Sequence, residues 1–168
     1  MAIPQLHAFT EKDSHLSHQE LEHPTTLRVL RAYPPEKASF KPHETSMTAI
    51  ETAWMMACMQ LDLDEVMADE MKMTGPPPIP KTWQELVAAY EKAHAEFVRK
   101  LRAIPDEALN GMIRVPGAKD RVEAHRRGDV LWYFLHALIH HRGQLSVYLR
   151  MVGGKVPSIY GPSGDEPW

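Results

Sequence analysis

The chain has 168 residues, of which 43% are hydrophobic and 24% are charged, and its formal net charge is −3 with neutral histidines. This length suits one domain with a single buried core, so residues 1–168 are expected to form one domain. The small negative charge argues against a nucleic-acid-binding face, which requires an excess of Lys and Arg.

Other classes are also disfavoured by composition. No apolar stretch approaches the length of about 18 residues that indicates a membrane span. The first eleven residues lack the charged start and apolar run of a secretory signal. Cys58 is the single cysteine, so an intrachain disulfide is impossible. A reducing compartment fits this cysteine usage, and a cytoplasmic location is expected.

Prolines and apolar periodicity divide the chain into helical stretches. The first helix is expected from about residue 17 to 32, where a Pro-Pro pair stops it. The second is expected from about residue 46 to 72, with Thr45 or Ser46 as its N-cap. Gly75, followed by three prolines, ends that helix.

A third helix is expected from about residue 82 to 103, because Thr82 and Glu85 have the spacing of a capping box. The segment after it contains Met112–Val115, which favours an extended conformation. No second strand is recognisable, so a sheet is not expected.

The fourth helix is expected from about residue 129 to 152, with Asp129 as its N-cap and a Gly-Gly pair at its end. Four amphipathic helices without strand alternation predict an all-α fold, a four-helix bundle. Its core is expected over about residues 17–152, and residues 153–168 should form an irregular tail.

The fourth helix and the tail carry a specific pattern. The helix contains His141-Arg142-Gly143-Gln144, and the tail contains Val156-Pro157 followed by Tyr160-Gly161. This pattern resembles the C-terminal signature of the DinB/YfiT-like superfamily, and the resemblance covers about residues 20–162. It implies a four-helix bundle, commonly dimeric, with a divalent metal such as nickel or zinc at one end. Some relatives are thiol-dependent transferases or metal-dependent hydrolases.

The resemblance also implies a ligand set of one histidine from the second helix and two from the fourth. His141 fills one of these positions. Ala137 stands one turn earlier, where the family has a second histidine, and Met55 stands in place of the histidine of the second helix. A thioether suits Cu(I) better than zinc or nickel. We therefore expect the family metal site to be partly lost.

Other histidines offer a rearranged metal site. His136 and His140 are one turn apart and share a face. That face lies nearly opposite the leucine stripe of the helix, so a solvated or dimer-interface role is the competing interpretation. His23 lies on the inward face of the first helix, and a site that combines His23 with His141 is a further hypothesis.

A pocket is expected where the metal would have been. Met55 and Met59 lie one turn apart with Glu51, and Ala137, His141 and Arg142 of the fourth helix are expected to complete the pocket.

Arg142 falls near the core stripe, where a guanidinium requires a carboxylate partner. Glu22, Glu51 and Asp62 are the candidates.

Three functions remain open, and no catalytic residue is assignable. The first is a DinB-like homodimer that binds a small apolar ligand or a partner through the pocket beside Met55 and Ala137. The alternative is a divalent-metal-dependent hydrolase or thiol transferase that uses His141 with rearranged ligands. The third is a structural dimer that uses the face of His136 and His140.

Overall fold

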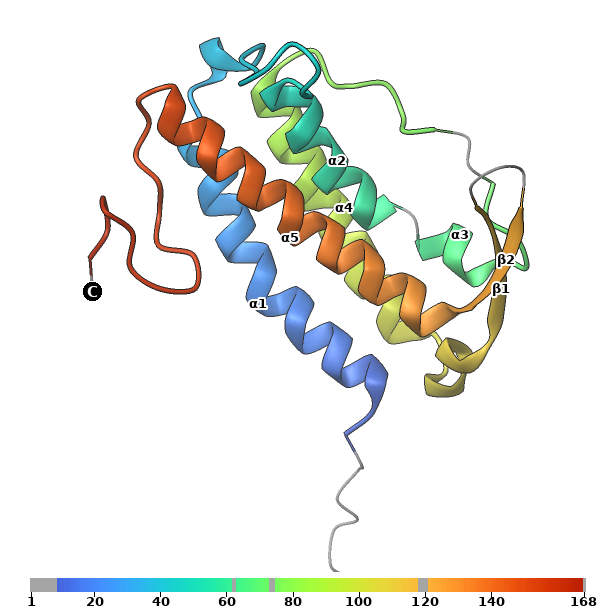
Figure 1. The fold of residues 1–168 in the computed structure, drawn as a ribbon. Coiled ribbons are helices and arrows are strands. Elements are labelled where there is room, and N and C mark those ends of the chain that lie inside the picture. The colour runs from blue at the N-terminus through green and yellow to red at the C-terminus, as the bar shows by residue number, and fades with distance from the viewer. Residues whose placement is uncertain (1–8, 62, 73–74, 118–120, 168) are drawn as a thin grey trace, which may run out of the picture.

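The computed structural model describes residues 9–61, 63–72, 75–117 and 121–167. Four long helices form the body of the molecule (Figure 1). They are α1 (Glu11–Ala32), α2 (Ala49–Leu61), α4 (Trp83–Ala103) and α5 (Arg127–Met151). Because α1 and α2 each pack against both α4 and α5, the fold is the all-α four-helix bundle that the sequence predicts.

Short elements join these helices. They are η1 (Pro35–Lys37), α3 (Leu63–Met67), η2 (Asp106–Asn110), β1 (Met112–Pro116) and β2 (Val122–Arg126). In the part of the chain that the structure describes, none of the helices combines the length and apolar character required to cross a membrane.

Capping boxes define the starts of α1 and α4. In α1, the Thr10 backbone N–H donates to the Asp13 carboxylate at 3.0 Å, and the Asp13 backbone N–H donates to the Thr10 hydroxyl at 3.2 Å. Two donors that the helix leaves unpaired are satisfied in this way. The helix consequently begins at Glu11, earlier than the predicted residue 17. Thr82 and Glu85 form the predicted box of α4.

The prediction of one long second helix is wrong at both ends. Thr48 and Glu51 make the reciprocal bonds of an N-terminal box, so Thr45 and Ser46 are not the cap. Beyond α3 the chain leaves the helix and bonds to β1 instead. The Met71 N–H donates to the Arg114 carbonyl at 2.9 Å, and the Arg114 N–H donates to the Asp69 carbonyl at 3.0 Å.

The hairpin of β1 and β2 corrects the expectation that no sheet forms. The two strands are antiparallel, with Ile113 opposite His125. Ile113 is buried, whereas β2 is exposed along most of its length, so β2 has no apolar pattern. The chain passes directly from β2 into α5. Asp129 is therefore not the N-cap, and its carboxylate accepts a bond from Arg126 at 2.6 Å.

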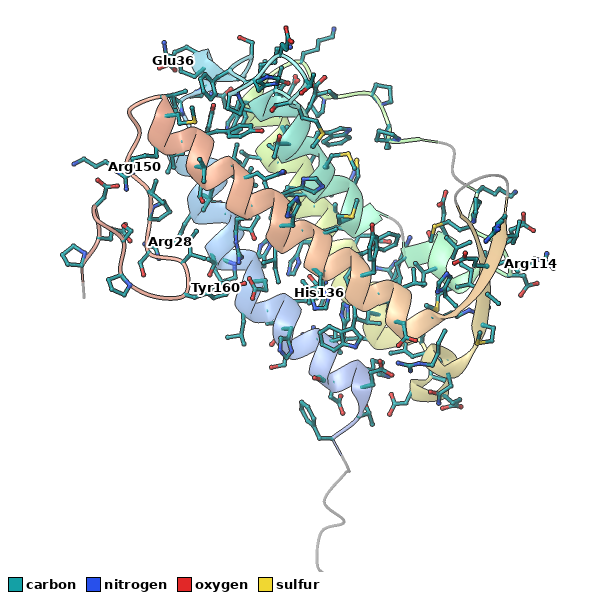
Figure 2. All side chains as sticks on the ribbon, in the orientation of Figure 1. Arg28, Glu36, Arg114, His136, Arg150 and Tyr160 are labelled. Atoms are coloured by element: carbon teal, nitrogen blue, oxygen red, sulfur yellow. The ribbon has the colours of Figure 1, made fainter. Side chains whose placement is uncertain are left out.

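The C-terminal tail returns along α1 and α5 (Figure 1). Gly153 adopts φ +82° after α5, a conformation that glycine accommodates at a helix end. Arg28 of α1 forms an ion pair with Glu166, and Arg150 of α5 forms one with Asp165 at 2.6 Å. Figure 2 shows Arg28, Arg150 and Tyr160 gathered where the tail passes these two helices.

Candidate functional site

An apolar cavity of about 260 Å³ lies between α2, the segment after α3, and α5. Its lining is rich in sulfur and aromatic groups: Met55, Cys58, Met59, Glu65, Met71, Gly75, Pro76, Pro77, Tyr133 and Phe134. The single charged side chain in this described lining is Glu65. Such a lining, mostly apolar with few polar groups, is typical of a small-molecule site.

A second cavity of about 450 Å³ adjoins the first on the side of the hairpin. The two cavities share Met71, Tyr133 and Phe134 as lining residues. The second adds apolar groups from β1 and α5, and its polar residues are His125 and Asp129. Together the two hollows have the size of a small-molecule pocket, which commonly measures about 300–1,000 Å³.

The predicted pocket residues are only partly brought together. Met55 and Met59 line the first cavity. Glu51 is exposed, and its carboxylate accepts bonds from Thr48 at the start of α2. Ala137 is half-buried on α5, one turn after Tyr133. The sequence missed Met71, Tyr133 and Phe134 as lining residues, because they approach Met55 only through the tertiary fold.

His141 is half-buried on α5. Its Nδ1 atom lies 3.1 Å from the side-chain oxygen of Gln144, on the next turn of the same helix. Burial lowers the pKa of His141, which favours the neutral imidazole. One ring nitrogen is therefore already engaged within the helix.

Arg142 belongs to a separate, buried polar cluster. Its Nη1 atom donates to the Glu22 carboxylate at 2.5 Å and lies 3.2 Å from the Thr26 hydroxyl. Its Nη2 atom donates to the Tyr160 hydroxyl at 2.6 Å, and that hydroxyl donates to Glu22 at 2.9 Å. The partner is thus Glu22 rather than Glu51, and Asp62 lies outside the described residues. Burial, followed by the bond to Glu22, raises the pKa of Tyr160.

His23 stacks on His94 of α4, a residue that the sequence analysis did not single out. The ring centroids are 3.7 Å apart with an interplanar angle of 9°. Both Nδ1 atoms are buried without a hydrogen-bond partner. Burial, assisted by His23, lowers the pKa of His94 to about 4. The helical spacing of His94 from Tyr90 and Phe97 was the available signal.

His136 and His140 lie on the outward face of α5, where both are exposed. Large apolar residues accompany them: Tyr133 is 68% exposed, Val147 57% and Met151 55%. Among the described residues, no group of three or more His, Cys, Asp or Glu side chains is arranged to hold a metal ion.

The chain is similar in sequence and in fold to known proteins. The model of the DinB family matches residues 9–167. A DinB-like protein from Bacillus cereus ATCC 10987 superposes with a TM-score of 0.71 at 21% identity, over 88% of this chain and 97% of that one. The DinB-like protein YjoA from Bacillus subtilis gives a TM-score of 0.67 at 19% identity, over 86% and 96% of the two chains.

A third solved structure, a DinB family member from Exiguobacterium sibiricum, gives a TM-score of 0.61 at 19% identity, over 85% of this chain and 92% of that one. In sequence, the chain is 32% identical over 90 residues to the uncharacterized protein YrdA of Bacillus subtilis. That match covers 53% of this chain, and the chain spans about half the length of this relative, 51%. The solved structures support the fold, and their names state no activity.

Proposed function

The chain belongs to the DinB family, and we propose that it is a ligand-binding member, which takes a small apolar molecule into the paired cavities beside Met55. The main support for this proposal is the mostly apolar set of side chains that lines the two cavities. Sulfur and aromatic side chains from α2, α5 and the hairpin side surround the hollows, and Glu65, His125 and Asp129 supply the polar groups. A few polar groups in an apolar cavity orient a ligand while burial holds it.

The residues at the family's metal positions do not fit a nickel or zinc ion. Met55 offers a thioether and Ala137 offers no donor atom. The Nδ1 atom of His141 faces Gln144, so His141 offers its Nε2 atom as the single imidazole donor at these three positions. His23, the proposed substitute ligand, stacks on His94 instead. These donor atoms favour ligand binding over a divalent-metal-dependent hydrolase or thiol transferase.

The fluorescent apolar probe N-phenyl-1-naphthylamine tests the proposal. Its fluorescence should rise on addition of the protein, and it should raise the melting temperature, because a ligand that binds only the folded state stabilises it. Met59→Trp should abolish both effects by filling the cavity. Met47→Trp, at an exposed methionine outside the lining, is the matched control. Stabilisation by nickel or zinc with none by the probe would contradict the proposal.

Restoring the family ligands provides a second arm. The double variant with Met55→His and Ala137→His should acquire nickel or zinc binding together with His141, measured by metal analysis of protein purified without an affinity tag. The unmodified chain should bind neither metal under the same conditions. Stoichiometric nickel or zinc in the unmodified protein would instead support the metal-dependent alternative.

We also propose that two chains associate through the outward face of α5. Tyr133 and Val147, both exposed, lie the same number of residues before and after His140. A two-fold axis at His140 would therefore place each against the other in the second chain, which is the arrangement of an isologous interface. Gly143 also lies on this face, with open space where a Cβ atom would project, which permits close approach.

Val147→Glu should convert the dimer to a monomer, measured by size-exclusion chromatography with light scattering. Val122→Glu is the matched control, because Val122 on the hairpin is also 57% exposed. A dimer that survives Val147→Glu would exclude this face.

A further inference from the structure

We propose that the cavity beside α2 also forms a binding site for a soft monovalent cation, copper(I). Four of its lining residues carry sulfur: Met55, Cys58 and Met59 of α2, and Met71 of the segment after α3. The proposal rests on the same cavity as the ligand-binding function above, and it adds a chemically different occupant.

The positions on α2 present three sulfur atoms on one side of the helix. Residues three and four apart are neighbours on a helix surface, and Met55 is followed at these spacings by Cys58 and Met59. Met55 and Met59 are half-buried, whereas Cys58 is only 4% exposed. Cys58 is therefore more deeply buried than the two methionines.

The fourth sulfur approaches from a separate and anchored segment. Met71 is 5% exposed, and its backbone N–H donates to the Arg114 carbonyl of β1 at 2.9 Å. The hairpin thereby holds Met71 at the boundary that the two adjoining cavities share. Sulfur groups from two separately positioned segments therefore line one hollow.

Donor chemistry selects the ion. Thiolate and thioether ligands favour copper(I), whereas carboxylate and water favour magnesium, calcium and manganese. Among the described lining residues of this cavity, Glu65 carries the single carboxylate and no imidazole is present. Cys58 binds copper(I) as the thiolate and releases its proton to solvent on binding. No oxidation or reduction of the protein accompanies this step.

The competing interpretation is that these methionines only fill space, as methionine commonly does. Replacement by leucine separates the two interpretations. Leucine nearly conserves volume and apolar character, so it keeps the cavity apolar and removes only the sulfur. Apolar-probe binding should survive Met55→Leu with Met59→Leu, whereas copper(I) binding should not.

The test is competition for copper(I), kept reduced with ascorbate, against the coloured chelator bicinchoninate. The protein should withdraw one copper(I) per chain. The double variant Met55→Leu with Met59→Leu should weaken this affinity by more than about tenfold, the lower end of the loss that changing even an outer-shell partner produces. Cys58→Ser should weaken it as well. Met56→Leu is the matched control, because Met56 lies on the same helix but outside the lining.

Two results would overturn the copper(I) site: the unmodified protein fails to withdraw copper(I), or the double variant binds copper(I) as tightly as the unmodified protein. Retained binding of the naphthylamine probe by the double variant shows that its cavity is intact, so that a loss of copper(I) reports the missing sulfur atoms. Failure of the probe with the unmodified protein, beside normal copper(I) binding, would reject the apolar-ligand function alone.

Discussion

Two regions that both depend on α5 differ in how the chain fills them. Around Arg142, each polar group meets another from the same chain: Glu22 and Thr26 from α1, and Tyr160 from the tail. Around Phe134, about two turns earlier on the helix, the side chains leave a hollow of about 260 Å³. The first region is filled by the protein itself, and the second contains space that the described side chains leave unfilled.

The contrast distinguishes polar residues that stabilise the fold from residues that border an unfilled cavity. Arg142 directly follows His141, the residue that the resemblance assigns to metal binding, yet Arg142 is 1% exposed and both of its terminal nitrogen atoms donate to groups of the same chain. A buried charge without a partner is strongly unfavourable, so its partners are required for stability. The cavity has no such requirement, and it therefore suits an exchangeable occupant.

The largest expected effect is the loss of the buried ion pair. Arg142→Ala leaves Glu22 buried without its cation and should lower the free energy of unfolding by about 3–5 kcal/mol, measured by urea unfolding. The matched control is Arg28→Ala, because the Arg28–Glu166 pair is half-exposed. That change should cost no more than about 1 kcal/mol. Equal effects of the two substitutions would remove the distinction between the regions.

The cavity side can be tested by truncating methionines on α2. Met56 is 0% exposed in the packed core, so Met56→Ala should create a new void and cost about 2–5 kcal/mol. Met59 already borders a hollow, so Met59→Ala should fall at or below the lower end of that range. Urea unfolding measures both changes. A larger loss for Met59→Ala would show that this side of α2 is tightly packed.

The stacked histidines form an intermediate case, because His94 is buried, His23 is half-buried, and the Nδ1 atom of each lacks a hydrogen-bond partner. An unfolded histidine takes up its proton near pH 6.5, whereas in the folded protein burial lowers the pKa of His94 to about 4. The folded state is therefore most stable above pH 6.5, and stability falls as pH drops toward 4, by up to about 3 kcal/mol. Burial also lowers the pKa of His23, which acts in the same direction.

Urea unfolding between pH 4 and pH 7.5 measures this dependence. His94→Phe keeps an aromatic ring against His23 but removes the titrating group, so the decline in acid should become shallower. His43→Phe, at an exposed position, should leave the slope unchanged. An unaltered slope in His94→Phe would assign the acid sensitivity to other groups.

The sequence predicted those features that depend on hydrogen bonds between residues close together in the chain. The spacing of Thr82 and Glu85 identified the start of α4 because both bonds of a capping box form within one turn. The hairpin was missed because β2 exposes nearly all its side chains and pairs through its backbone. An apolar alternation, the usual signal of a strand, is absent there.

In the candidate site, too, residues close together in the chain were predicted, whereas residues from separate segments were not. Met55 and Met59 were predicted from their spacing on one helix, whereas Met71 and Phe134 join them only when separate segments pack. A carboxylate partner for Arg142 was predicted from the charge in the core stripe. Its identity was not, because Glu22 is 120 residues away in the chain.

The smallest effect tests whether the tail contributes to the closed region. Tyr160 is 70% exposed as a residue, yet its hydroxyl contacts both Glu22 and Arg142. Tyr160→Phe removes only that oxygen, and it should lower the free energy of unfolding by about 1 kcal/mol, the usual contribution of one hydrogen bond.

Tyr133→Phe is the control for Tyr160→Phe, with both compared in chains made monomeric by Val147→Glu, where Tyr133 is similarly exposed, at 68%, and it should change stability by less than about 0.5 kcal/mol. Since the guanidinium keeps Glu22 and Thr26 as partners, the loss in Tyr160→Phe should stay well below that in Arg142→Ala. Equal losses in the two tyrosine variants would mean that α1 and α5 close the polar cluster without the tail.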